Sequence, residues 1–157
     1  MVNRLAVSLH SLGAEFHTGA LVLASLALIG AFITRKQDST LHKQLEAVAF
    51  FAAMFGVLSL IFSAIVGWLI WPSGSLLFSP SVWRKIMFTV FSLTFWTLFL
   101  YIRFKFKSDL WKNTSLSQIY FLTGIGGILT LIYTGTMGGK LTGKESILDA
   151  IVGLFGR

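Results

Sequence analysis

Four long apolar stretches constrain the fold of this 157-residue chain more than any other feature of its sequence. They cover residues 12–33, 45–71, 86–102 and 119–137. Each reaches or approaches the ~20 residues that a helix needs to cross the hydrocarbon layer of a bilayer, and each is too long for a strand. Backbone groups in lipid must find hydrogen-bond partners within their own segment, as they do in a helix. The sequence therefore predicts an all-α integral membrane protein, an antiparallel bundle of four transmembrane helices.

The composition supports lipid as the solvent of this chain. Charged residues make up 12% of it, against about 25% in an ordinary soluble domain. The net charge of +7 comes from basic residues at the ends of the apolar stretches, with no long basic tract, so nucleic-acid binding is not expected. Cysteine is absent, which excludes disulfides and cysteine-ligated metal sites.

The chain divides into a bundle over residues 1–140 and a tail over residues 141–157. Thr142 and Glu145 have the spacing of a capping box, in which each side chain accepts a hydrogen bond from the backbone N–H of the other residue. Apolar residues then recur at helical spacing, namely Ile147, Leu148, Ile151, Leu154 and Phe155. We expect a short amphipathic helix in the membrane interface, or alternatively a helix that docks on another chain.

The distribution of basic residues predicts the orientation in a cell membrane. Four spans place both termini on the same side, with the loops 34–44 and 103–118 on the other side. These loops carry seven basic residues, whereas the opposite side carries four outside the tail. The positive-inside rule therefore predicts cytoplasmic loops and non-cytoplasmic termini.

Small and aromatic residues indicate how the helices pack. Small residues that let helix backbones approach closely follow one face of the first, second and fourth spans: Ala20, Ala24, Ala27, Ala31, Ala49, Ala53, Gly56, Ser63, Gly67, Gly124, Gly127, Thr130 and Thr134. The third span is aromatic, with Phe88, Phe91, Phe95, Trp96, Phe99 and Tyr101. We expect its rings to contact lipid, or alternatively a partner subunit.

Two early histidines and two methionines form the candidate cofactor and metal site. His10 and His17 are two helical turns apart and share a helix face. Met87 begins the third span and Met137 ends the fourth, on the same side of the membrane as the histidines. This set has the ligand types for His/Met-coordinated haem b or for a copper ion. The alternative is that the histidines are satisfied by water at headgroup level.

Several other functions are not expected. His42 begins the second span at the opposite membrane surface, about 25 Å from His17 by the helix rise, so the two cannot share one haem iron. The stretches 48–71 and 86–102 contain no charged residue, which argues against a proton relay or pump. Catalysis by this chain alone is not expected either, and no soluble substrate is identifiable.

Short motifs suggest a family. They are the stretch from His10 to Phe16, the small residues leading to Gly67-Trp68, and Gly138-Gly139 followed by Lys-Leu. Together they resemble the four-helix membrane family known as domain of unknown function 2231. Ser11 stands where that family has proline, and a histidine expected at the start of the third helix is absent. The resemblance therefore implies a four-helix topology and matches only His10 of the family's histidines; the family has no settled activity.

The most consistent functional hypothesis is a non-catalytic membrane subunit. Such a chain would pack with other integral membrane subunits in a larger complex of the electron-transfer or oxidase/monooxygenase type. The alternative hypothesis is a small membrane redox protein that binds haem b or copper near the side carrying the termini, through the histidine and methionine residues above.

Overall fold

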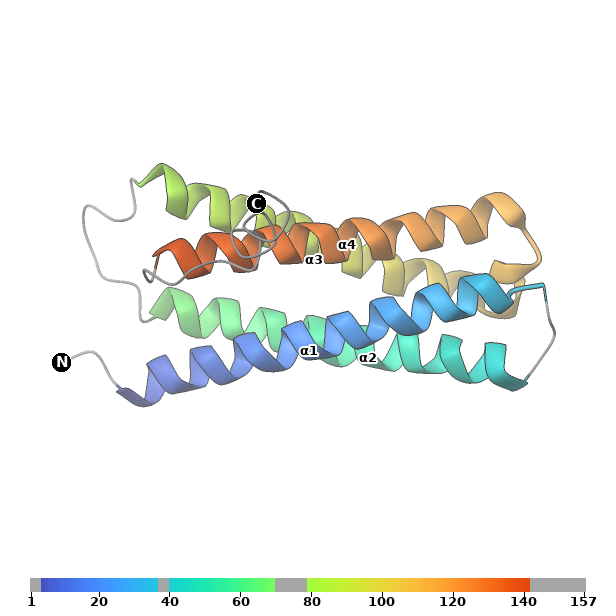
Figure 1. Cartoon of the computed structure of the whole chain (residues 1–157), viewed down its shortest axis with the longest axis horizontal. Coiled ribbons are helices and arrows are strands. Elements are labelled where there is room, and N and C mark those ends of the chain that lie inside the picture. The colour runs from blue at the N-terminus through green and yellow to red at the C-terminus, as the bar shows by residue number, and fades with distance from the viewer. Residues whose placement is uncertain (1–3, 37–39, 70–78, 142–157) are drawn as a thin grey trace, which may run out of the picture.

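A computed structural model describes residues 4–36, 40–69 and 79–141, and this part of the chain is all-helical (Figure 1). Four of its helices are long and apolar enough to cross a membrane. The elements are α1 (Arg4–Thr34), α2 (Thr40–Leu69), α3 (Pro80–Phe106), the short 3-10 helix η2 (Lys107–Trp111) and α4 (Thr114–Leu141). The predicted bundle of four long apolar helices is confirmed. The predicted tail helix lies outside the described residues from position 142 onward.

Each helix begins several residues before its predicted apolar stretch, because the polar flanking residues are also compatible with a helix. Pro80 opens α3 after Ser79, which is extended (φ −69°, ψ 127°). Proline is favoured at a first helical position because its φ angle is already helical and its missing N–H group is not needed there. α3 ends where Lys107 adopts a φ of 44° while its backbone N–H donates to the Arg103 carbonyl.

α1 and α2 pack through small residues. Gly56 lies against Leu21, and a Cβ atom at this position would come within 2.6 Å of the Leu21 Cγ atom. Ala24, Ala49 and Ala53 are fully buried. Two helices can approach this closely because small residues on one face leave room for the side chains of the facing helix. Most of the predicted small-residue faces are thus helix–helix contact faces.

α3 and α4 pack through an aromatic face against glycines. Trp96 is fully buried, and a Cβ atom at Gly127 would come within 2.6 Å of its indole Nε1. The Ser92 hydroxyl donates a hydrogen bond to the Gly127 carbonyl (3.2 Å). Phe99 is also fully buried. The prediction that the aromatic residues of this helix face lipid or a partner is therefore wrong for Trp96 and Phe99, because the glycines of α4 provide the space for them.

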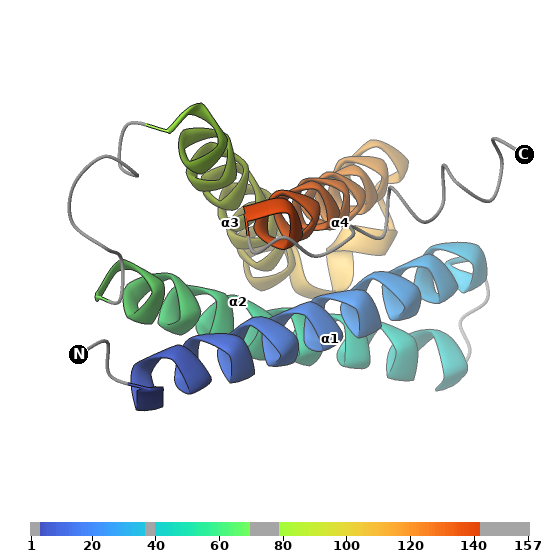
Figure 2. The ribbon, with the colours of Figure 1, turned by 60° about the vertical axis from the view of Figure 1, so that its left-hand side comes forward.

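The α1–α2 pair lies beside the α3–α4 pair (Figure 2). Phe32 of α1 stacks on Phe121 of α4, with ring centroids 4.2 Å apart, and Leu28 of α1 occupies the space beside Gly124 of α4. These contacts belong to the end of the bundle where α1 and α3 end and where α2 and α4 begin. We call it the loop end, and the opposite end, where α1 begins, the His10 end.

Candidate functional site

His10 belongs to the contact between α1 and α2. Its Nδ1 atom is 2.8 Å from the Ser63 carbonyl oxygen, and the Ser63 hydroxyl donates to the His10 carbonyl (3.2 Å). Gly67 leaves room for the imidazole, since a Cβ atom there would come within 2.8 Å of the ring. One ring nitrogen of His10 is therefore engaged in holding two helices together, and only Nε2 remains for a ligand.

His17 is buried two turns further along α1. Its Nδ1 atom has no hydrogen bond of good geometry to the residues described, although the Gly13 carbonyl lies nearby. That carbonyl already accepts a hydrogen bond from the Ser59 hydroxyl (3.1 Å). Of the two predicted histidine ligands, His17 therefore has fewer hydrogen bonds to the rest of the protein than His10.

Of the two predicted methionine ligands, only Met87 has a side chain that the structure describes. Met87 lies on α3 with 52% of its surface exposed. Met137 lies in α4, and its side chain is outside what the structure describes. Within residues 4–36, 40–69 and 79–141, no three His, Asp or Glu side chains are grouped as metal ligands. The His/Met site remains a prediction.

His42, at the loop end, caps the C-terminal end of α1. It is buried, and its Nδ1 atom lies 3.0 Å from the Ala31 carbonyl oxygen and 3.4 Å from the Thr34 hydroxyl. The Ala31 carbonyl is among the last four of α1, which lack a partner in a continuing helix. A ring N–H from α2 supplies that partner, and the ring meets Trp111 edge-on at 4.8 Å.

One turn after His42, Glu46 forms an ion pair that joins α2 to α3. Its Oε1 atom is 2.5 Å from the Nε atom of Arg103, although the two are not aligned as a hydrogen bond. Glu46 is only 8% exposed. A buried carboxylate without a counter-charge is strongly unfavourable, so the guanidinium explains how this acid is accommodated in an apolar helix.

Tyr120 of α4 and Trp111 of η2 pack against each other near this ion pair. The Tyr120 ring is fully buried and stacks on Phe99 at 4.2 Å, with the Trp111 ring edge-on at 5.7 Å. The Tyr120 hydroxyl and the Trp111 indole N–H have no hydrogen-bond partner among the described residues. Glu46 and Arg103 are close enough to influence the hydroxyl electrostatically. We refer to His42, Glu46, Arg103, Trp111 and Tyr120 as the polar junction.

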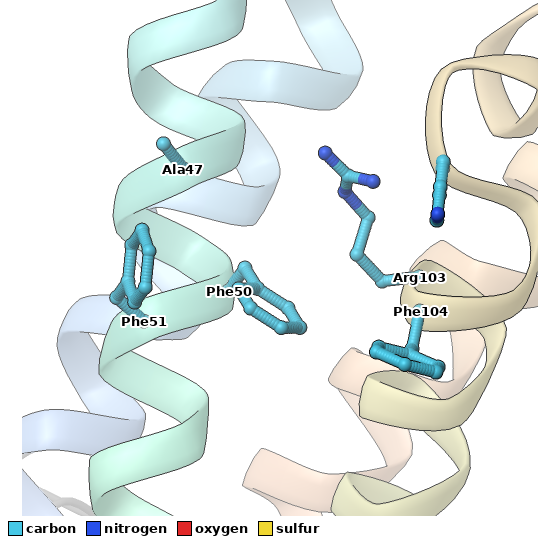
Figure 3. Close-up of a pocket in the computed structure, with 6 residues that line it drawn as sticks. Ala47, Phe50, Phe51, Arg103 and Phe104 are labelled. Atoms are coloured by element: carbon cyan, nitrogen blue, oxygen red, sulfur yellow. The ribbon is translucent and has the colours of Figure 1, made fainter.

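A groove opens beside the polar junction, between α2 and α3 (Figure 3). Its volume is about 290 Å³. Apolar residues of α2 line one side and both cations lie on the other: Ala47, Phe50 and Phe51 from α2, Arg103 and Phe104 from α3, and Lys107 from the start of η2. The groove can therefore offer an apolar wall and two cations to one ligand.

Sequence reasoning missed the polar junction, although two signals pointed to it. His42 and Glu46 are four residues apart, which places them on one face of a helix. An acid inside the second apolar helix also requires a counter-charge, and Arg103 is the first cation after the third apolar stretch. The aromatic partners Trp111 and Tyr120 carry no comparable signal.

Comparisons with known proteins do not identify a relative with this arrangement. The chain matches no protein-family model, no curated protein and no solved structure. The resemblance to the domain of unknown function 2231 family therefore stays a prediction, carried by the motifs around His10, Gly67 and Gly138.

Proposed function

We propose that the chain is inserted in a cell membrane as an antiparallel four-helix bundle with both termini on the non-cytoplasmic side. Four helices of membrane-spanning length and hydropathy support insertion. Large apolar side chains, such as Leu26, Phe55 and Leu122, are more than half exposed along these helices, which lipid covers more favourably than water. The basic residues of the loop end support its cytoplasmic placement.

Within the membrane, the chain acts as a non-catalytic subunit of a larger complex. The observation that carries this proposal is how four interior ionisable groups are used: His10, His42, Glu46 and Arg103. His10 bonds to Ser63, His42 to Ala31, and Glu46 pairs with Arg103. Each contact joins two helices, so these groups have structural partners instead of being arranged around a reacting atom.

The outer face of α3 is the surface most suited to a partner subunit. In the apolar 18-residue segment of α3, a smaller share of residues is buried (22%) than in the corresponding segments of the other membrane-length helices (33% or more). Exposed apolar side chains recur along it at helical spacing: Trp83, Met87, Val90, Leu98 and Tyr101. We propose that another integral membrane chain covers this face, in an assembly of the electron-transfer or oxidase/monooxygenase type.

Extraction in a mild detergent followed by native mass spectrometry tests the proposal. We expect one assembly of fixed stoichiometry that contains this chain and a redox-active membrane protein. A photo-crosslinking residue at Val90 should then link to that same partner, whereas one at the exposed Leu58 of α2 should not. A chain that extracts as a monomer and crosslinks only to lipid from both positions would refute the subunit proposal.

The second candidate is a membrane redox protein, favoured by one observation. His17 presents a buried imidazole nitrogen that makes no hydrogen bond of good geometry to the described residues, on the same helix as His10. Purified protein would then show a haem Soret band or stoichiometric copper, and His17→Ala would abolish it. Protein from haem- and copper-supplemented cells that contains neither group would end this alternative.

A further inference from the structure

The groove between α2 and α3 combines two features that seldom occur together on a lipid-facing surface. Three phenylalanines, Phe50, Phe51 and Phe104, form its apolar wall, and both Phe51 and Phe104 are more than half exposed. Arg103 and Lys107 extend into the same space. A charged side chain near the hydrocarbon layer is costly unless it finds a counter-charge or water.

Arg103 keeps unused hydrogen-bond donors on the groove side. Its ion pair with Glu46 involves the Nε atom. No hydrogen bond joins its two terminal nitrogens to the residues described. In Figure 3 the guanidinium projects from α3 into the space between the helices. A guanidinium carries five N–H donors in a planar fork, so a second oxyanion can bind while Glu46 stays in place.

Lys107 adds a positive charge that nearby acids do not cancel. Asp109, the next acid along the chain, pairs with Lys112 instead (2.7 Å). The φ angle of 44° at Lys107 is uncommon for a residue with a Cβ atom. This turn places Lys107 one residue after the end of α3, four residues after Arg103, and both line the groove.

We propose that this groove binds one anionic membrane phospholipid. The phosphodiester group accepts hydrogen bonds from the terminal nitrogens of Arg103 and from the Lys107 ammonium. One acyl chain lies along Phe50, Phe51 and Phe104. Basic pockets between membrane helices are suited to anionic headgroups on the cytoplasmic side, and the loop end carries the larger share of basic residues in the sequence.

The apolar wall selects a lipid over a soluble anion. Inorganic phosphate would satisfy Arg103 and Lys107 but would leave the three phenylalanine rings uncovered. An acyl chain covers them and holds the headgroup at the level of the cations. The inference rests on the proposed membrane insertion, but it does not depend on a partner subunit.

Native mass spectrometry of the full chain, released from nanodiscs that contain equal amounts of phosphatidylglycerol and phosphatidylcholine, tests the inference. We expect one phosphatidylglycerol molecule per chain to survive release, in about fivefold excess over phosphatidylcholine, given roughly this effect for one basic residue near an anionic headgroup. Inorganic phosphate and glycerol phosphate at millimolar concentration should not displace it. Recovery of the chain in nanodiscs independently reports membrane insertion.

Matched variants separate this site from general surface charge. Lys107→Gln should reduce the retained phosphatidylglycerol about fivefold, whereas Lys105→Gln should not. Lys105 is exposed and has the same charge, but its ammonium lies over the Tyr101 and Phe106 rings and it does not line the groove. Ala47→Phe should fill the groove without changing charge, whereas the same substitution at the exposed Ala64 should leave lipid retention unchanged.

Three results would overturn the lipid site. They are equal retention of the two lipids by the unaltered chain, equal losses in the two lysine variants, and displacement of the lipid by inorganic phosphate. In each case the chain would still be recovered in nanodiscs, so the failure would concern the groove. A chain that does not enter nanodiscs would instead refute membrane insertion, and the lipid site with it.

Discussion

At the His10 end, the polar contacts join α1 to α2, through Ser63 hydroxyl and backbone groups. At the loop end, the Glu46–Arg103 ion pair and the His42–Trp111 ring contact connect the α1–α2 pair to α3 and η2. The first kind of contact consists of hydrogen bonds and lies within one helix pair. The second kind is charged or aromatic and lies between the pairs.

This difference indicates how the two helix pairs find their arrangement. Small residues allow any two apolar faces to approach, and their packing has little directional preference. An ion pair in an apolar setting has a strong preference, because every arrangement that separates Glu46 from Arg103 leaves a charge uncompensated. The loop end therefore fixes how the pairs are placed, while the His10 end fixes the spacing within one pair.

The largest expected effect comes from removing one partner of the ion pair. Arg103→Ala leaves the buried Glu46 carboxylate without its counter-charge, and we expect a loss of about 3 kcal/mol in the free energy of unfolding. Titration with SDS in mixed micelles, followed by circular dichroism, measures this loss. Lys105→Ala removes a charge of the same sign two residues away and should change stability little; equal losses would mean that the pair does not organise the loop end.

The next largest effect is expected inside the α3–α4 pair. Gly127→Ala places a methyl group against the buried Trp96 indole, and such overpacking costs about 2 kcal/mol. Gly135→Ala on the same helix has open space around its Cβ position and should be neutral or slightly stabilising. The same SDS titration compares them. If the two variants unfolded at the same SDS fraction, the close contact between Trp96 and α4 would not exist in the folded protein.

Removing the cap on α1 should have a smaller effect. His42→Ala leaves the Ala31 carbonyl with only the longer contact to the Thr34 hydroxyl (3.4 Å). We expect a loss of about 1.5 kcal/mol, as for other buried groups left without a hydrogen bond. Faster amide hydrogen exchange in residues 31–36 would locate the loss at the end of α1. The exposed Gln44→Ala variant is the control, and unchanged exchange in His42→Ala would exclude a capping role.

The smallest effect belongs to the His10 end. Ser63→Ala removes the hydroxyl that donates to the His10 carbonyl. Hydrogen bonds between membrane helices contribute about 0.6 kcal/mol on average, and we expect a loss of that size in the unfolding titration. Ser115→Ala, at an exposed position of α4, should give no loss. A Ser63→Ala loss as large as that of Arg103→Ala would contradict the contrast between the two ends.

The sequence predicted the four helices well because apolar length is a local property that each segment carries by itself. The small faces of α1, α2 and α4 were also predictable, since helical spacing decides which residues share a face. The position of Trp96 was not predictable from its own helix, because it depends on Gly127, which is 31 residues away in the sequence.

The polar junction was harder to predict for the same reason. Its residues come from α2, α3, η2 and α4, and no single helix contributes more than two of them. The predicted ligands His10 and His17 do share a helix. The structure gives His10 a partner on α2, and a spacing rule on one helix cannot anticipate a neighbour from another.

The order of the junction residues along the chain has a consequence for synthesis. Every group that links α1 to α2 is present once residue 69 has been added. Glu46, in contrast, is synthesised 57 residues before Arg103. The first helix pair can therefore form early with an unsatisfied acid on its surface, and only a chain that has received its third helix neutralises it. A truncated product that ends before Arg103 would retain this carboxylate without its counter-charge.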